Sequence, residues 1–244
     1  MRIDLNCDLG EGMGHDTAIM PLVSSANIAC GAHAGDPATM AASVELALRH
    51  GVAIGAHPGY ADRGHFGRRE LSLGVAAIVE LVLSQIDSLA RIAGHLHHLK
   101  LHGALYNRAS SDPEIATALA AALAASHPGI VIYAMAGSEF AGAARAASLP
   151  VADEAFVDRA YTPDGSLVPR SQPLAVLEDP EAAARQACRL VCEGRVAALG
   201  GRELSIRPDT LCIHGDAPAA PAIAQAVHVA LLREGMEIGA ATGR

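Results

Sequence analysis

The segment Asp4-Leu5-Asn6-Cys7-Asp8-Leu9-Gly10-Glu11 alternates strictly between polar and apolar residues up to Leu9. Side chains of an extended strand alternate between two faces, so the apolar residues share one face and the polar residues share the other. A row of carboxylates and amides facing a shared interior is costly unless the groups are hydrogen-bonded or used. Because functional side chains also end the strand-like segments that follow, we expect this strand to form the centre of an active site in an α/β fold.

Strand-like and helix-like segments alternate along the rest of the chain, as is typical of parallel βα units. We predict strands at about residues 2–9, 25–31, 52–56, 96–101, 130–134, 151–157 and 210–213. We predict helices at about residues 16–22, 37–50, 75–93, 112–126, from 138, 179–194 and 218–234. About seven such units without a linker or a repeat predict one domain over residues 1–244. A closed or nearly closed barrel is favoured, with a doubly wound open sheet as the alternative.

Local signals mark the ends of several elements. Asp36-Pro37, Asp112-Pro113 and Asp179-Pro180 each place a helix-capping residue before a proline that suits the first helical position. The charged, glycine-containing loop 61–71 is long enough to act as a lid. The longest irregular stretch is 158–177, and loops of such length in a compact domain are usually functional. A small hairpin is expected over 195–207.

The composition of the 244 residues argues against several classes of function. Hydrophobic residues make up 51% and charged residues 18%, so most of the chain must be buried. Aromatic residues make up only 3%, which argues against base-stacking nucleic-acid platforms and aromatic-lined sugar clefts. The net charge of −8 argues further against a phosphate-backbone binder, so no nucleic-acid partner is expected.

Cysteine use and hydropathy predict where the protein resides. The five cysteines are odd in number, and Cys7, Cys30 and Cys212 lie in apolar strand-like runs, which is typical of buried, reduced thiols. Cys188 and Cys192 lack the further ligands of a zinc site. The first residues lack the apolar core of a signal peptide, and no run approaches the ~20 apolar residues of a membrane span. We therefore expect a soluble, cytoplasmic protein without a membrane partner.

Ionisable residues gather at the carboxyl ends of the predicted strands, where barrels and open α/β sheets both bind ligands. In the fourth strand the two leucines face one way, and Lys100 and His102 face the other. A lysine held inward requires an anionic partner or a substrate anion. The aspartates available to Lys100 are Asp4, Asp8 and Asp158. Such a pair can fill the interior, take part in catalysis, or do both.

His33 and His57 follow the second and third strands. With an aspartate from a neighbouring strand, the two could hold a divalent metal that keeps open coordination positions. A single histidine is more often a satisfied polar residue than a ligand, but His102 and His214 occupy equivalent strand ends. This repetition favours a functional cluster, with or without a metal.

Other candidate groups bind anions or transfer protons. Arg159 and Arg170 suit a carboxylate or a phosphate because the guanidinium fork matches two oxygens, although a surface pair with Asp158 is the alternative. Glu11 is expected to transfer protons or to brace its loop. The sequence contains no phosphate-binding loop, dinucleotide-binding glycine motif or nucleophilic-serine elbow. Attack by water, steered by carboxylate and histidine and aided by lysine or metal, is better supported.

Taken together, the strand ends resemble the LamB/YcsF family over essentially the whole chain. The motifs that carry the resemblance are DLNCDLGE (4–11), NIACGAHAGDP (27–37), GAHPGY (55–60), KLHGALYN (100–107), EAFVDRAY (154–161), LVPR (167–170) and CIHGD (212–216). Several separate motifs in the same order make chance agreement very improbable. Ala32 and Gly59 stand where the family more often has Phe and Ser, which affects the width of the mouth and leaves the polar set intact.

The resemblance implies a fold and an activity. It implies a TIM-like (β/α)7 barrel, akin to glycoside hydrolases and polysaccharide deacetylases. It also implies the ATP-dependent opening of the lactam 5-oxo-L-proline to L-glutamate by a 5-oxoprolinase, with partner subunits B and C. The lactam is an unstrained, resonance-stabilised amide, so activation by ATP would make attack by water feasible. The lack of a recognisable ATP motif agrees with other subunits contributing to that activation.

The residue pattern and the family resemblance together suggest a role for each candidate residue. The residues expected to be catalytic are Asp8, Lys100, His102 and Asp158, with Asp8 or His102 as the general base. The residues expected to bind substrate are Asn6, Glu11, Asn27, Arg159, Arg170 and His214. His33 and His57 are the candidate metal ligands. The alternatives are a stand-alone metal-dependent amidohydrolase or carbohydrate deacetylase, and a non-catalytic binding subunit.

Overall fold

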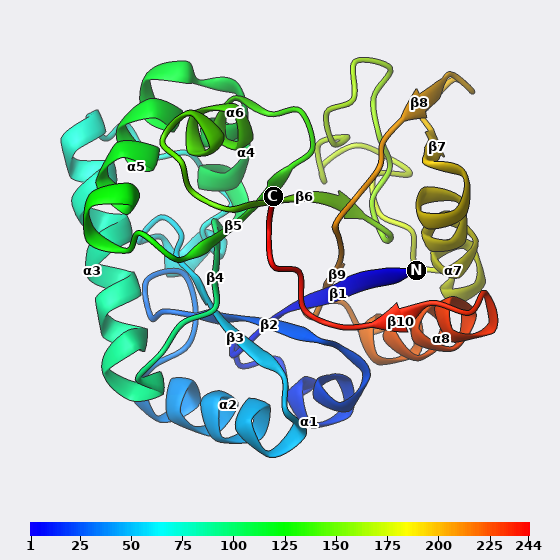
Figure 1. Ribbon diagram of the computed structural model, residues 1–244, viewed down its shortest axis with the longest axis horizontal. Coiled ribbons are helices and arrows are strands. Elements are labelled where there is room, and N and C mark those ends of the chain that lie inside the picture. The colour runs from blue at the N-terminus through cyan, green and yellow to red at the C-terminus, as the bar shows by residue number, and fades with distance from the viewer.

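Seven parallel strands close into a barrel in the computed structural model, which describes residues 1–244 (Figure 1). The strands are β1 (Arg2–Leu9), β2 (Ser25–Ala29), β3 (Ala53–His57), β4 (His98–Lys100), β5 (Val131–Met135), β6 (Val151–Phe156) and β9 (Thr210–His214). Each pairs with the next in this order, and β9 pairs with β1 over Asp4–Asp8 and Thr210–His214, which closes the ring. The predicted α/β barrel is confirmed, and the open-sheet alternative is excluded.

Helices surround the ring of strands in Figure 1. They are α1 (Asp16–Ile19), α2 (Pro37–His50), α3 (Val75–Ala93), α4 (Gly103–Ser111), α5 (Pro113–Ser126), α6 (Glu139–Ala146), α7 (Pro180–Cys188) and α8 (Ala220–Arg233). The outward faces of the strands pack against them, and Leu5, Cys7 and Leu9 of β1 are buried in this layer. Burying each leucine-sized side chain stabilises the fold by about 1.5–3 kcal/mol. None of the helices combines the length and the apolar composition needed to cross a bilayer.

The predicted helix starts are confirmed at three places. The carboxylate of Asp36 accepts a hydrogen bond from the Thr39 amide at the start of α2. Asp112 and Asp179 cap α5 and α7 in the same way, each accepting from two backbone amides. Gly51 ends α2 in the left-handed conformation, at a φ of 67° that favours glycine. These caps satisfy backbone amides that would otherwise lack partners, and so they fix where each helix begins.

Several segments differ from the simple alternation or refine it. A helix, α4, directly follows His102, where the sequence indicated only a strand end. Gly103 permits this sharp entry at a φ of 54°, and the many polar residues of α4 conceal its helical period. The predicted hairpin forms from β7 (Arg195–Ala197) and β8 (Glu203–Ser205), which pair antiparallel. The remaining short elements are 3₁₀ turns at Met20–Leu22 and Arg63–His65, a π turn at Arg189–Glu193, and β10 (Glu237–Ile238).

The C-terminal segment covers the end of the barrel where the strands begin. Figure 1 looks onto this end, and the red C-terminal segment runs across the ring. Val151 at the start of β6 and Arg244 exchange two backbone hydrogen bonds, of 3.2 and 2.9 Å. Ala241 packs against a small apolar cluster of Val131, Tyr133 and Ala152. Because this end is covered, the opposite end, where the strands finish, is the accessible face of the barrel interior.

Candidate functional site

Polar side chains occupy much of the barrel interior, beginning at the covered end. Asp4 accepts hydrogen bonds from the hydroxyl groups of Ser24, Ser25 and Thr210, at 2.5, 2.8 and 2.5 Å. Burial raises the pKa of the Asp4 carboxyl, although these hydrogen bonds act in the opposite direction. Asp4, one of the predicted partners of Lys100, is thus bonded into the floor of the barrel instead.

Two asparagine side chains connect this floor to the centre of the barrel. Asn6 Nδ2 donates to Glu154 Oε1 at 3.0 Å and to Thr210 Oγ1 at 2.7 Å. Asn27 Nδ2 donates to Asn6 Oδ1 at 2.7 Å and to Asp8 Oδ1 at 2.8 Å. Both asparagines are fully buried, and their side-chain amides bond to other residues of the barrel. These bonds orient the carboxyl groups of Asp8 and Glu154.

Lys100, the single lysine of the chain, lies at the centre with 2% of its surface exposed. Its Nζ is 2.8 Å from Asp8 Oδ1 and 3.1 Å from Glu154 Oε1. It also lies 2.7 Å from Cys212 Sγ and 5.4 Å from the centre of the Phe156 ring. Of the three aspartates that the sequence offered, the structure selects Asp8 and adds Glu154 as a second acidic partner.

The electrostatic surroundings keep both Lys100 and Asp8 ionised. Burial alone would lower the pKa of Lys100, but the carboxylates of Asp8 and Glu154 raise it well above its usual 10.5. Burial alone would raise the pKa of Asp8, but His57 and Lys100 hold it well below its usual 3.8. Lys100 is therefore an ammonium and Asp8 a carboxylate at neutral pH. Burial raises the pKa of Cys212 well above its usual range, so its sulfur stays protonated as a thiol.

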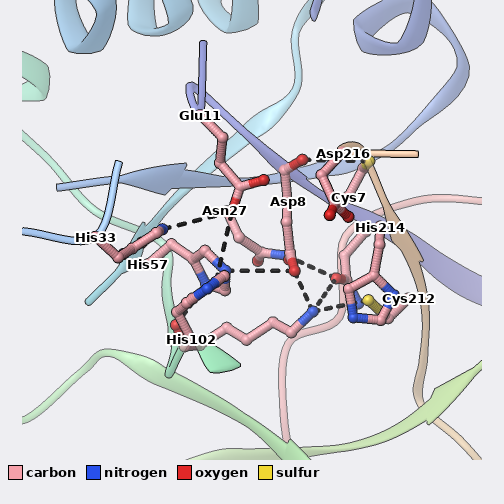
Figure 2. Close-up of polar contacts among 12 residues, drawn as sticks. Cys7, Asp8, Glu11, Asn27, His33, His57, His102, Cys212, His214 and Asp216 are labelled. Atoms are coloured by element: carbon pink, nitrogen blue, oxygen red, sulfur yellow. Dashed lines mark hydrogen bonds and ion pairs between the residues drawn. The ribbon is translucent and has the colours of Figure 1, made fainter. Parts of the chain in front are cut away.

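Three imidazoles and one carboxyl group, from Glu11, His33, His57 and His102, converge beside this centre (Figure 2). We call them the imidazole cluster. Glu11 Oε1 lies 3.4 Å from both His33 Nε2 and His102 Nδ1. His57 Nε2 lies 2.9 Å from His102 Nδ1. The rings of His33 and His102 stack in parallel, with their centres 3.8 Å apart. One ligand atom from each residue lies within 4.8 Å of all the others, so the four could hold a metal ion.

The cluster is screened from water, and its pKa values reflect this. Burial lowers the pKa of His33 to about 3 and holds that of His102 well below its usual 6.5. Burial and the nearby Asp8 raise the pKa of Glu11 well above its usual 4.5. His33 and His102 are consequently neutral imidazoles at neutral pH, the form in which histidine can act as a metal ligand or a base.

The loop 61–71, predicted to be long enough for a lid, covers the imidazole cluster. The Phe66 ring packs edge-on against His33 and His102, with ring centres 5.8 and 5.5 Å away. The Phe66 carbonyl lies 2.8 Å from His102 Nε2. Gly67 accepts a hydrogen bond from the Ala104 amide. The loop is thus bonded to His102 and to the start of α4, as a cover rather than an open flap.

A second histidine–carboxylate pair lies on the other side of Lys100. His214 Nδ1 is 3.0 Å from both oxygens of Asp158, and the His214 amide also donates to Asp158 Oδ2 at 2.9 Å. Burial alone would raise the pKa of Asp158, but His214 outweighs it and lowers the pKa, so Asp158 is ionised. A carboxylate can only accept, so Nδ1 carries the proton. The other ring nitrogen, Nε2, is left free in neutral His214.

A cavity of about 960 Å³ opens above these groups and is lined by Asp8, Lys100, His102 and His214. Three arginines also line it. Arg68 pairs with Asp216 at 2.6 Å, and Arg170 approaches the same carboxylate at 3.9 Å. Arg159 is almost fully buried and donates only to backbone carbonyls, those of Ala175 and Val168. Burial and the nearby Arg170 lower the pKa of Arg159 to about 10, and it remains cationic at neutral pH.

The structure brings the residues singled out in the sequence to one end of the barrel, but in different surroundings. Those that line the cavity are Asp8, Lys100, His102, Arg159, Arg170 and His214. Those that stand behind them are Asn6, Asn27, His33, His57, Glu11 and Asp158. No functional role was expected for Glu154, Cys212, Arg68 or Asp216, although all but Arg68 lie within the motifs of the family resemblance. Glu154 is four residues before Asp158, and Cys212 is two residues before His214. Residues an even number of positions apart on a strand share a face, so strand periodicity predicts that both side chains point into the barrel.

Comparison with known proteins identifies relatives that span the whole chain. The model of the LamB/YcsF family matches residues 3–244. The A subunit of 5-oxoprolinase from Thermus thermophilus is 49% identical over 98% of this chain and 100% of its own length. The protein of the same name from Heliobacterium modesticaldum is 48% identical over 98% of each chain.

Solved structures agree with the fold. A crystal structure of a lactam utilization protein from Thermus thermophilus superposes with a TM-score of 0.92 at 48% identity, covering 98% of this chain and 100% of that one. A putative cellobiose-phosphate cleavage protein from Enterococcus faecalis superposes with a TM-score of 0.60 at 12% identity, covering 99% and 97% of the two chains. The second likeness concerns the barrel fold alone.

Proposed function

The chain belongs to the LamB/YcsF family, and on this premise we propose that it is the lactam-opening A subunit of a 5-oxoprolinase. In this proposal it hydrolyses 5-oxo-L-proline to L-glutamate, with ATP consumed together with partner subunits B and C. The observation that carries the proposal is the buried Lys100 ammonium, which lies between two acidic side chains and lines the cavity. The names of the full-length relatives support the choice of substrate.

Lys100 is proposed to stabilise the charge that develops during the reaction. When water attacks an amide carbonyl, negative charge gathers on the carbonyl oxygen, and a fixed cation in a site that excludes water stabilises it strongly. Lys100 is held by Asp8 and Glu154, so its Nζ needs little reorganisation as the charge forms. The same ammonium suits a phosphorylated form of the substrate, because the phosphate, like the oxyanion formed by water attack, carries negative charge on oxygen.

The proposed general base is Asp8, His102 or His214. Asp8 is ionised, but its low pKa makes it a weak base. His102 and His214 are neutral at neutral pH, and each has one ring nitrogen without a proton. Asp158 fixes the tautomer of His214, an arrangement that orients histidine bases in other hydrolases. We therefore propose Asp158 as a positioning residue and His214 as a base, in addition to the two residues favoured by the sequence.

The arginines at the mouth are proposed to bind the substrate carboxylate. Arg159 has no acidic hydrogen-bonding partner, and its bonds to two carbonyls hold its side chain in place. Arg170 lies 3.9 Å from Asp216, a distance that leaves room for a substrate oxygen to compete. A planar guanidinium suits a carboxylate because it offers two parallel donors.

The role of ATP is proposed to lie with the whole complex. This chain lacks a phosphate-binding loop, and its single lysine is committed to the barrel centre. We accordingly propose that subunits B and C help to activate the lactam, which is a poor electrophile. None of the five cysteines forms a disulfide, which supports a reducing compartment, and we propose the cytoplasm.

The test is to mix the chain with its two proposed partners and 5-oxoproline, and to follow glutamate release with and without ATP. We expect release only with all components present, and a loss of about 10²–10³-fold in turnover for Lys100→Ala. Asp8→Asn is expected to impair turnover too, whereas Arg49→Ala on the exposed surface of α2 serves as the control. Unchanged turnover in both site variants would contradict the assignment.

A stand-alone metal-dependent amidohydrolase or carbohydrate deacetylase is the second candidate, favoured by the imidazole cluster. That activity would need neither ATP nor partners, and chelation would abolish it. A non-catalytic binding protein would instead show a thermal shift with 5-oxoproline while the assembled complex kept full activity after Lys100→Ala.

A further inference from the structure

The hydrogen bonds of two histidines in the imidazole cluster fix which of their nitrogens carry protons. His57 Nδ1 lies 2.9 Å from the Lys100 carbonyl, and His102 Nε2 lies 2.8 Å from the Phe66 carbonyl. A carbonyl oxygen can only accept, so both of these nitrogens must donate. In neutral His102 the opposite nitrogen, Nδ1, then carries a lone pair, and it faces His57 Nε2. These two atoms lie 2.9 Å apart, and Asp8 Oδ2 lies 3.3 Å from the same His57 nitrogen.

The other two members of the cluster also direct unsatisfied atoms to the same place. Neither ring nitrogen of His33 has a hydrogen-bond partner, and neither has Oε1 of Glu11, although all three atoms are buried. A buried polar atom without a partner costs about 1–3 kcal/mol. Three buried atoms without partners, all in one cluster, make an unfavourable arrangement for the protein alone. A positive species at their common centre would satisfy them together.

We propose that this cluster binds one divalent transition-metal ion through Glu11 Oε1, His33 Nε2, His57 Nε2 and His102 Nδ1. Tetrahedral zinc bonds of about 2.0–2.1 Å place neighbouring ligand atoms roughly 3.3–3.4 Å apart. The two separations from Glu11 are 3.4 Å, which matches that spacing without any movement. The His57–His102 separation of 2.9 Å is shorter and would open slightly around an ion.

The surroundings have the outer contacts that metal-binding histidines usually have. The carbonyls of Lys100 and Phe66 hold two of the rings, as second-sphere acceptors do in metal sites. Three imidazoles and one carboxylate suit zinc, cobalt or iron, whereas magnesium and calcium prefer oxygen alone. Phe66 and the cover loop exclude bulk water from one side, and His102 borders the cavity on the other. The ion would therefore lie beside the lactam-binding space.

This inference does not depend on the proposed reaction, since an ion can bind whatever the substrate is. The sequence hypothesis placed His33, His57 and an aspartate from a neighbouring strand around a metal; the structure adds His102 and offers Glu11 as the carboxylate. Metal binding also bears on proton transfer. If His102 Nδ1 is bound to a metal, it cannot accept a proton from water, and Asp8 and His214 are the remaining candidate bases.

The test uses the full chain, freed of metal with a chelator and then titrated with Co²⁺ and with Zn²⁺. We expect one equivalent to bind, visible Co²⁺ absorption bands typical of nitrogen and oxygen ligands, and a rise in melting temperature on binding. His33→Gln and Glu11→Gln should each weaken binding by more than the ~10–100-fold that losing an outer contact costs. Mg²⁺ should neither compete nor stabilise.

His228→Gln is the matched control, because this histidine lies on α8 and its Nδ1 contacts the Leu22 carbonyl. It should bind as tightly as the wild type. A second group of possible ligands, Asp8, Cys212 and His214, lies nearby, so His214→Gln is tested in parallel. Binding that is lost in His214→Gln but retained in His33→Gln would overturn the proposal, as would the absence of stoichiometric binding. If His33→Gln does not fold, the wild-type titration and Glu11→Gln still decide.

Discussion

At the scale of single residues, the unusual feature is a lone lysine that serves two acidic partners. Lys100 contacts both Asp8 and Glu154, and all three side chains are almost completely buried. Removing one member of a buried ion pair is strongly destabilising, because the other charge is left without compensation. The cost should therefore depend on which member is removed.

We expect Lys100→Met to lower the free energy of unfolding by about 3–5 kcal/mol, because both acidic side chains lose their partner. Asp8→Asn should cost less, about 1–3 kcal/mol, because Lys100 retains Glu154 and the amide can still accept from Asn27. Chemical denaturation monitored by circular dichroism measures both values. An equal cost for the two variants would show that Glu154 does not share the lysine.

At the scale of elements, paired positions on neighbouring strands of the barrel carry side chains of complementary size. Gly55 lies on β3, opposite His98 on β4, and the His98 ring occupies the space where a larger residue would project. A Cβ atom at position 55 would lie 2.1 Å from His98 Nε2, far inside contact distance. The ring is also fixed by its bond to Asn27, so it cannot simply turn away.

Gly55→Ala is therefore expected to destabilise the protein by roughly 1–3 kcal/mol or more, the usual cost of overpacking a core. Thermal denaturation measures this. Gly142→Ala is the matched control, because a Cβ there meets nothing within 4 Å, and alanine in the α6 helix should be neutral or stabilising. A wild-type melting temperature for Gly55→Ala would contradict the tight fit, and recovery in the Gly55→Ala/His98→Ala double variant would confirm its cause.

At the scale of the whole molecule, an interior rich in ionisable groups ties stability to pH. Burial holds the pKa of His98 well below its usual 6.5, so the folded protein keeps this ring neutral. Below pH 6.5 the unfolded chain binds a proton at His98 that the folded chain does not. The stabilising contribution of the neutral ring is thus complete above pH 6.5 and is lost as the pH falls toward the folded pKa.

For metal-free protein, we expect the unfolding free energy to fall between pH 6 and pH 5, with His98 contributing about 1.4 kcal/mol per pH unit. The new side chain of His98→Gln can still donate to Asn27 but does not titrate. The unfolding free energy of this variant should therefore fall less steeply between pH 6 and pH 5, by the contribution assigned to His98. Urea denaturation at several pH values provides the measurement. Parallel curves for the two proteins would show that His98 is not the group responsible.

The C-terminal segment is the other feature that acts on the whole molecule. Deleting residues 240–244 removes the two backbone hydrogen bonds to Val151 and the contact of Ala241 with the floor. At about 0.5–1.5 kcal/mol for each hydrogen bond, plus the lost apolar contact, we expect a destabilisation of roughly 2–4 kcal/mol. Arg244→Ala removes only a mostly exposed ion pair with Asp209 and should cost at most ~1 kcal/mol. Equal melting temperatures for the deletion and Arg244→Ala would contradict a role for the backbone contacts.

The extent to which the sequence predicts the fold differs from residue to residue. The alternation through Asp4, Asn6 and Asp8 predicts an inward polar face, because strand geometry has a fixed period of two. The aspartate–proline pairs predict helix starts for an equally local reason. The acidic partner of Lys100 cannot be predicted from local sequence, because it depends on how strands far apart in the chain are staggered around the ring. Only the closed barrel places Glu154 beside Lys100.

In the candidate site, too, some features follow from local sequence and others depend on the folded structure. That His33, His57 and His102 lie at strand ends follows from the sequence pattern, and so does their gathering at one end of the barrel. The orientation of their rings does not, because it is set by two backbone carbonyls and by a loop whose path has no periodic signal. The pairing of Arg68 with Asp216 could not be expected for the same reason, since both residues lie in loops outside the strands.

The pairing of β1 with β9 has a consequence for biosynthesis. Residues 2–9 leave the ribosome early, whereas their neighbours at 210–214 are made about 200 residues later, roughly 10–40 s at ordinary translation speeds. During that interval one edge of the first strand has no partner, and Asp4 and Asn6 lack the Thr210 hydroxyl to which both bond in the folded protein. The nascent chain must therefore be kept from pairing with other polypeptides until its penultimate strand emerges.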